Sequence, residues 1–334
     1  MAEHAGVAVS AVSLVLNGKP GVSERRRAAI RRSIEELGYV HVHRPQTALR
    51  AVAIGLVMEA LSPEAAKDGF MAEVVSGVEQ GLRDHDMHML LQLCRAGDDP
   101  LRDLEEVTGR RVDGVILANG GDVDDEVVRR VTASGLPVVL LENYVEESAR
   151  THAVTADNFT AGHLATTHLL ELGHRRIGML LGSTRYVSLR DRRYGYQAAL
   201  LDAGIQPDSD LMPAQEHGEQ IKGYRQTEHL LRLPEPPTAI YAVSDKSAFG
   251  AYQAIADARL RIPEDISIVG TDDVRQSQLM SPPLTTFHVP TFDLGRAAAA
   301  TMSSLIERSE SDRVIPARTS LLGSLVVRGS TRRL

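Results

Sequence analysis

The stretch AEHAGVAVSAVSLVLNGKPGVSERRRAAIRRSIEELGY, residues 2–39, has the pattern of a compact unit of short helices. Two helical patterns meet at a tight turn formed by Ala5, Gly6 and Val7, and a third, strongly basic helix follows. Glycine suits such a turn because it has no Cβ and therefore tolerates a positive φ. This order of elements is typical of a helix-turn-helix reader of DNA, whose second helix enters the major groove.

Apolar spacing predicts the bounds and inner faces of the last two helices of this stretch. The second helix is expected over 8–16, and the third is expected to begin after Ser23, a good N-cap, and to end at Gly38. The inner faces are predicted to carry apolar residues at helical spacing, namely Val9, Val12 and Leu16 in the second helix and Ile30, Ile34 and Leu37 in the third.

Basic residues are concentrated in the first fifty positions. Eight Lys and Arg stand there against four acidic residues, a balance of +4, so that the total of −7 leaves −11 for the rest of the chain. A basic head on an acidic body suits a polyanionic partner for the head only. The alternative is that the arginines of 25–32 merely solvate one face of a helix.

From residue 51 onward, continuous apolar runs alternate with helical patterns. The apolar runs predict strands at 52–58, 87–93, 112–117, 137–141, 177–181, 239–243 and 266–269. Helices are predicted near 70–84, 99–109, 123–134, 158–172, 189–203, 220–232 and 246–258. Such an alternation is typical of parallel sheets covered on both faces. We therefore expect an α/β body of two doubly wound subdomains, with ligands in a cleft beyond the carboxyl ends of the strands.

Several motifs, in the expected order, resemble the LacI/GalR family of bacterial transcription regulators. The head carries AGVAVSAVSLVLNGKPGVS and ELGY, and the body carries VDGVI at 112–116, LGHRRI at 172–177, PEDISIVG at 263–270, PPLTT at 282–286 and VRGS at 327–330. The resemblance implies a helix-turn-helix head before a body like that of the type I periplasmic binding proteins. It divides the chain into a head at 1–40, a hinge at 41–50, an N-terminal subdomain at 51–153 and 288–314, and a C-terminal subdomain at 154–287 and 315–334.

In that family the residues just after the turn read bases, and hydroxyls around the turn hold phosphates. The resemblance implies that this chain contacts DNA through Val9, Ser10, Ser13, Asn17, Val22 and Ser23. The family usually has Ser, Thr and Arg where this chain has Ala8, Ala11 and Leu14. Each replacement removes a phosphate or base contact worth about 1–3 kcal/mol. The first half of the first helix is also absent, which indicates either a true start further upstream or a damaged head.

Residues 41–50 are expected to form the hinge. The family has a short helix here that orders on DNA and wedges leucine into the minor groove. Leu49 is the candidate for that wedge, and Pro45 fits only as the first residue of such a helix. A plain flexible linker is the alternative.

Effector contacts in the family cluster at the strand ends. Arg192 matches an arginine that pairs with sugar hydroxyls or with an effector carboxylate, a task suited to the planar guanidinium fork. Asp272 matches an acceptor of bonds from ligand hydroxyls. The further candidates at strand ends are Glu142, Ser244, Asp245 and Phe70. The alternative for each is a surface ion pair or a helix cap, and a sugar or related polyol is the first choice of ligand.

These features predict a homodimeric, DNA-binding repressor whose affinity for its operator is controlled by a small-molecule effector. Dimerisation is expected through the helices near 70–84 and 290–307, because an operator with two half-sites needs a two-fold protein. The alternative is a cytosolic small-molecule binder whose head no longer reads DNA.

Other classes of protein lack support in the sequence. We find no phosphate-cradling glycine loop, no Gly-x-Ser-x-Gly elbow and no metal-ligand spacing, so neither an enzyme nor a cofactor or metal is expected. No signal segment and no apolar run long enough for a membrane span occur, which favours a cytoplasmic protein without a membrane partner. The single cysteine, Cys94, is expected to be a small core residue on a strand.

Overall fold

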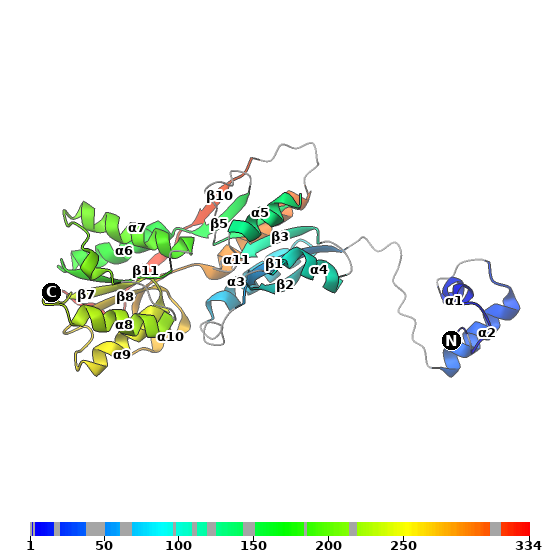
Figure 1. The fold of residues 1–334 in the computed structure, drawn as a ribbon, viewed down its shortest axis with the longest axis horizontal. Helices are drawn as coiled ribbons and strands as arrows, with labels where there is room; N and C mark the ends of the chain where they lie inside the picture. The colour runs from blue at the N-terminus through cyan, green and yellow to red at the C-terminus, as the bar shows by residue number, and fades with distance from the viewer. Residues whose placement is uncertain are drawn as a thin grey trace. The chain divides into compact units, whose positions relative to one another are not determined.

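The computed structural model describes residues 2, 4–16, 21–37, 51–60, 69–95, 98–108, 112–118, 125–142, 151–183, 186–213, 219–307 and 315–334. The chain divides into two compact units, Met1–Ala51 and Val52–Leu334 (Figure 1). We call them the head and the body and describe each by itself.

The head contains the two helices predicted from the apolar spacing, α1 at Val9–Leu16 and α2 at Glu24–Glu36. Gly6 has a φ of 62°, which confirms the expected positive-φ turn before α1. The backbone N–H of Arg27 donates to the carbonyl oxygen of Ser23 over 2.9 Å, so α2 begins where the sequence predicted. Val12 and Ile30 are buried where the two helices pack together.

The predicted inner face of the third helix is wrong at Leu37. This residue follows the last residue of α2 and is 50% exposed. Ser33 is buried in its place, one turn after Ile30, where its small side chain lets the ring nitrogen Nδ1 of His4 approach its hydroxyl to 3.1 Å. The predictions for Asn17, Gly38 and the hinge at 41–50, including Leu49, lie outside the described residues.

The first sheet of the body has six parallel strands in the order β10-β5-β4-β3-β1-β2. The strands are β1 Val52–Glu59, β2 Met87–Cys94, β3 Gly114–Ala118, β4 Val138–Leu141, β5 His152–Ala156 and β10 Arg318–Leu321. One face packs against α3 (Phe70–Arg83) and α11 (Thr291–Glu307), and the other against α4 (Pro100–Thr108) and α5 (Asp125–Ala133). Because both faces are covered, the inner strands β1, β3 and β4 read as continuous apolar runs.

The second sheet has five strands in the order β11-β9-β8-β7-β6, all parallel except for β11 against β9. Its strands are β6 Ile177–Leu180, β7 Ala239–Ala242, β8 Ser267–Asp272, β9 Thr285–His288 and β11 Ser324–Val326. Helices α6 (Asn158–Glu171) and α7 (Val187–Asp202) cover one face, and α8 (Glu219–Leu231) and α9 (Asp245–Asp257) cover the other (Figure 1). The short α10 (Arg275–Leu279) and a 3₁₀ turn at Ser209–Leu211 complete this part. The doubly wound α/β class predicted from the sequence is confirmed.

The strand pairing differs from the predicted subdomain boundaries at two places. Residues 154–156 complete β5, and β10 pairs with β5 rather than with the second sheet. Segments 154–156 and 318–321 therefore belong to the first sheet, and the chain returns to the second sheet only with β11. The sequence missed this because β10 has mostly exposed side chains and no apolar run.

Cys94 is fully buried in the core cluster beneath α5, as expected for a small core residue. In the described part of the chain, we find no helix with both the length and the apolar character needed to cross a lipid bilayer.

Candidate functional site

Arg192 is the centre of a buried polar cluster at the carboxyl ends of the strands of the second sheet. Its Nε donates to Oδ1 of Asn158 over 2.9 Å, and its Nη1 donates to the carbonyl oxygen of Val243 over 2.6 Å and to Oδ1 of Asp272 over 2.8 Å. Burial is the largest influence and opposes the charge of the guanidinium, but Asp272, Tyr241 and Glu142 together outweigh it and raise the pKa of Arg192. The structure thus joins the two residues that the sequence ranked first.

Glu142 extends the cluster to the first sheet. It follows β4, is buried, and has a φ of 55°. Its carboxylate accepts hydrogen bonds from the backbone N–H of Ala156 and, over 3.3 Å, from Nδ2 of Asn158. Burial raises the pKa of Glu142 despite these bonds and the nearby Arg192 charge.

Asn158 is the member of the cluster that sequence reasoning missed. Its amide joins the Glu142 carboxylate to the Arg192 guanidinium. The preceding Asp157 caps this helix, because its side chain accepts from the N–H of Thr160 over 2.9 Å. An asparagine directly after an aspartate cap could have been a signal, because its side chain lies at the same strand end as the cap.

Asp272, the last residue of β8, and Asp273 after it have an uncommon backbone conformation. Asp272 and Asp273 have φ values of 126° and 60°, in a region that costs residues other than glycine on the order of 1–3 kcal/mol each. Asp273 is held by Arg328, at 2.5 Å, and by His288, at 3.3 Å. The Asp272 side chain keeps 13% exposure beside the nearly fully buried Arg192. Strain of this kind at a strand end is typical of a binding site.

Ser244 and Asp245 serve the fold of the second sheet. The Ser244 hydroxyl accepts from the N–H of Ser247 and caps α9. Asp245 is fully buried, and its carboxylate accepts from the N–H of Val274 and, over 2.5 and 2.6 Å, from the hydroxyls of Ser277 and Thr286. Asp245 therefore ties α9 to β9 and to the segment around α10, which gives it a structural role in the second sheet.

We expect Asp245 to make the body less stable as pH rises. Burial and the nearby Asp272 raise its pKa above 3.8, despite its three hydrogen bonds. Below 3.8 both the folded and the unfolded state hold the proton, so the contribution of Asp245 is fully present. As pH rises further, the unfolded state releases the proton first, and stability falls by up to about 1.4 kcal/mol per pH unit until the raised pKa is reached.

Urea unfolding of the wild type and of Asp245→Asn, at about pH 4, 6 and 8, measures this effect. The free energy of unfolding of the wild type, relative to that of the permanently neutral variant, should decrease with pH. A difference that is constant over this range would show that Asp245 is charged in the folded protein throughout.

Side chains from both sheets also meet around this cluster. Phe70, the first residue of α3, packs against the cores of both sheets. The hydroxyl of Tyr186 donates to Oε2 of Glu59, at the end of β1, over 3.0 Å. Arg318 on β10 lies 3.7 Å from Asp191 on α7. A ligand at the Arg192 cluster would therefore lie where the two halves of the body contact each other.

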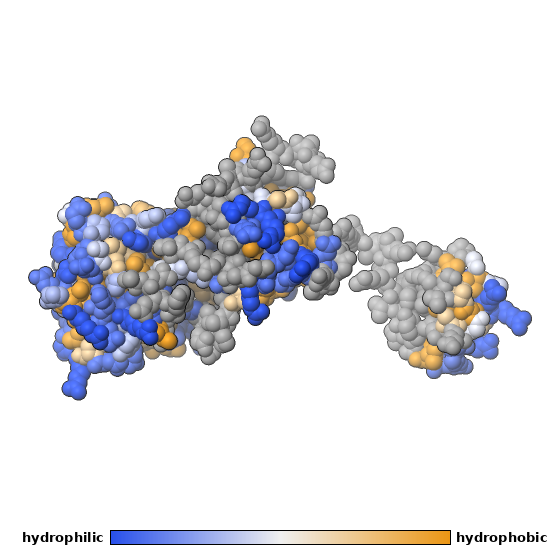
Figure 2. Space-filling view, in the orientation of Figure 1, coloured by the Kyte–Doolittle hydropathy of each residue, from blue (hydrophilic) through white to orange (hydrophobic). Residues whose placement is uncertain are grey.

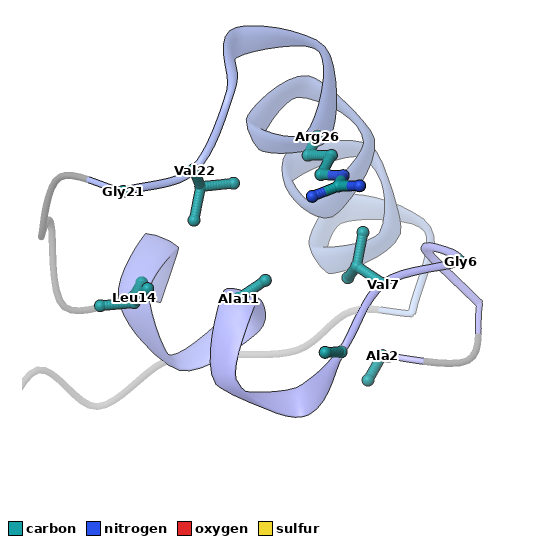
Figure 3. Close-up of a pocket in the computed structure, with 9 residues that line it drawn as sticks. Ala2, Gly6, Val7, Ala11, Leu14, Gly21, Val22 and Arg26 are labelled. Atoms are coloured by element: carbon teal, nitrogen blue, oxygen red, sulfur yellow. The ribbon is translucent and has the colours of Figure 1, made fainter.

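One face of the head is concave beside α1, and the hollow has a volume of about 560 Å³. Figure 3 shows its lining residues on the segment before α1, on α1, on the loop before α2 and on α2, namely Ala2, Gly6, Val7, Ala8, Ala11, Leu14, Gly21, Val22 and Arg26. Arg25, Arg26, Arg31 and Arg32 on α2 are exposed, and Figure 2 shows hydrophobic and strongly hydrophilic residues side by side on the head.

The predicted DNA contacts are only partly described. Val22 is half-buried at this face, and Ser23 is exposed. Val9, Ser10 and Ser13 lie on α1, but their side chains are outside the described residues, as are Asn17 and Leu49.

Comparison with known proteins covers both units. Residues 1–41 match the family of bacterial regulatory proteins of the lacI type, and residues 51–322 match the periplasmic binding proteins and sugar-binding domain of the LacI family. The ribose operon repressor of Haemophilus influenzae is 32% identical over 92% of this chain and 91% of its own length. A complex of the transcriptional regulator CelR with cellobiose is 30% identical, with a TM-score of 0.75 over 98% of both chains. The lac repressor dimer bound to operator and an anti-inducer is 25% identical, with a TM-score of 0.74 over 99% of this chain and 97% of that one.

These matches cover the helix-turn-helix head and the two-sheet body in the order that the sequence predicted. The chain belongs to the LacI family of bacterial regulatory proteins, the family of DNA-binding, effector-controlled transcription repressors.

Proposed function

We propose that this protein is a transcriptional repressor whose affinity for its operator is set by a neutral polyol, in the first instance a sugar. The effector would contact Arg192 and Asp272, with Glu142, Phe70 and the Ser244 region around it. The observation that carries the proposal is the Arg192–Asp272 pair, at 2.8 Å. Its guanidinium is buried, and its carboxylate keeps 13% exposure. The proposal contains no catalytic step.

The charge balance of the cluster favours a neutral ligand over an anion. Asp272 balances the charge of Arg192. Burial raises the pKa of Glu142, which indicates that further negative charge is disfavoured at this position. Among the described residues of this cluster, a carboxylate or phosphate would meet the positive charge of Arg192, which Asp272 already balances. Sugar hydroxyls both donate and accept, so they can bond to the Asp272 carboxylate and to the guanidinium together. The cellobiose-bound relative and the ribose operon repressor support the same class of ligand.

Control of DNA binding would follow from a change in how the two sheets of the body are arranged relative to each other. An effector that binds one arrangement of the sheets more tightly shifts the population toward it, and with it the spacing of two heads in a dimer. We propose that the hinge at 41–50, with Leu49 as the wedge, transmits this change. The dimer would form through α3 and α11. The similar lac repressor is a dimer on its operator, which supports a dimer here as well.

A second candidate function is a small-molecule binder whose head no longer reads DNA. The apolar residues Ala8, Ala11 and Leu14 along the concave face of the head favour it, because they offer no hydrogen bonds to phosphates or bases.

Selection of bound duplexes from a randomised DNA pool with the purified protein tests the main proposal. We expect a pseudo-palindromic sequence whose binding weakens steeply with salt, because phosphate contacts release counterions. Isothermal titration with ribose, cellobiose, glucuronate and glucose 6-phosphate should show heat from a neutral sugar and none from the two anions.

The control for the head is the variant in which Arg25, Arg26, Arg31 and Arg32 are replaced by Gln, which should lose DNA binding and keep sugar binding. Failure to select any sequence would favour the second candidate. Binding of the anions alone would overturn the neutral-ligand proposal.

A further inference from the structure

Most side chains that line the concave face of the head are apolar, where a DNA reader usually has polar side chains. Of its nine lining residues only Arg26 is charged, and none of the others carries a polar side-chain atom. Leu14 lies over the end of the loop that follows α1, since a Cβ built on Gly21 would lie 3.8 Å from its Cδ1. In Figure 3, Ala11, Val22 and Arg26 point into the space between α1 and α2.

The position of this face identifies its occupant. It is formed by α1, the second helix of the helix-turn-helix unit, which is the helix that lies in the major groove. Arg26 lines the face, and further exposed arginines lie on the same helix, which supplies the positive charge that binding to the phosphate backbone requires. An apolar centre with basic residues next to it therefore matches a base edge flanked by phosphates. It does not match a second copy of this acidic body.

The chemistry of the base edges narrows the choice further. In the major groove, guanine, adenine and cytosine present only hydrogen-bond donors and acceptors, whereas thymine also presents its C5-methyl group. A leucine side chain has no donor or acceptor, so it can favour a base only through apolar contact. We propose that Leu14, supported by Ala11 and Val22, packs against a thymine methyl group and requires thymine at one position of each half-site. This inference rests on the proposed function, because it needs the head to bind DNA.

Replacement of thymine by deoxyuridine in the selected operator tests the inference, because it removes the methyl group and keeps the base pairing. One thymine position of the half-site should respond, with a loss of about fourfold in affinity, the value of one buried methyl group. The same replacement in both half-sites should lose about fifteenfold. Affinities are measured by fluorescence anisotropy at one fixed salt concentration.

The variant Leu14→Ala links this response to its residue. It should bind the thymine and the deoxyuridine operators equally, while Leu37→Ala, the same truncation at an exposed position of the head, should keep the wild-type preference. Circular dichroism of both variants should match the wild type.

The possible outcomes separate the two proposals. Selected DNA that no deoxyuridine replacement weakens would overturn this inference and leave the proposed function standing. A response that persists in Leu14→Ala would also overturn it, since another residue would then read the methyl group. If no DNA is selected at all, both proposals fail.

Discussion

Arg192→Met is expected to abolish effector binding and to lower the free energy of unfolding of the body by about 3–5 kcal/mol. The substitution removes the positive member of a buried pair and takes the guanidinium away from the Asp272 carboxylate. Asn158 and the Val243 carbonyl lose a donor in the same step. Urea unfolding followed by circular dichroism measures the loss of stability, and isothermal titration with the sugar found in the screen measures binding.

The double variant Arg192→Met with Asp272→Leu separates stability from binding. Replacing both members of a buried pair by apolar residues is often neutral, so much of the lost stability should return. Effector binding should not return, because the guanidinium and the carboxylate that would bond to the sugar hydroxyls are both gone. Recovery of sugar binding in the double variant would contradict the assignment of this pair to the effector.

Arg232→Met is the matched control. Its guanidinium is 75% exposed and pairs with Glu228 on the same helix at 2.9 Å. An exposed pair of this kind contributes at most about 1 kcal/mol, so the variant should bind the sugar like the wild type. A loss as large as that of Arg192→Met would show that removal of any arginine destabilises the body.

Most of the body could be predicted from the sequence because its strands are covered on both faces. Runs such as the one that became β1 are apolar at every buried position, and a run of this kind between helical patterns has few other interpretations. Four strands that the apolar runs did not predict are β5, β9, β11 and β10, and of these β10 lies at the edge of the first sheet with exposed side chains. Its pairing with β5 depends on where the chain crosses between sheets, which local patterning does not encode.

The candidate site was predicted in part for a similar reason. Arg192 and Asp272 lie in motifs, and a motif can be found without knowledge of the fold. The role of Asp245 could not be found in this way, because its partners Val274, Ser277 and Thr286 are 29 to 41 positions away. Only the folded second sheet brings those donors around one carboxylate. Asn158 likewise acquires its role from groups on two different sheets.

Gly295→Val is expected to destabilise the body by about 3 kcal/mol, at the upper end of the usual cost of overpacking. Gly295 lies where α11 crosses α3, and a Cβ built on it would lie 2.3 Å from the carbonyl oxygen of Val74 and 2.6 Å from the N–H nitrogen of Val78. Since both are backbone atoms, the side chain can be accommodated only if the two helices move apart. Thermal and urea unfolding measure the loss.

The same change should also weaken DNA binding if α3 and α11 form the dimer interface. Helices that have moved apart would present a different surface to the partner subunit, so sedimentation should show more monomer and anisotropy a weaker operator complex. Ala300→Val, at an exposed position of the same helix, is the control and should cost only about 0.5–0.7 kcal/mol through helix propensity. Equal stability of the two variants would contradict the close crossing. A destabilised Gly295→Val protein that is still fully dimeric would place the dimer interface on another surface of the body.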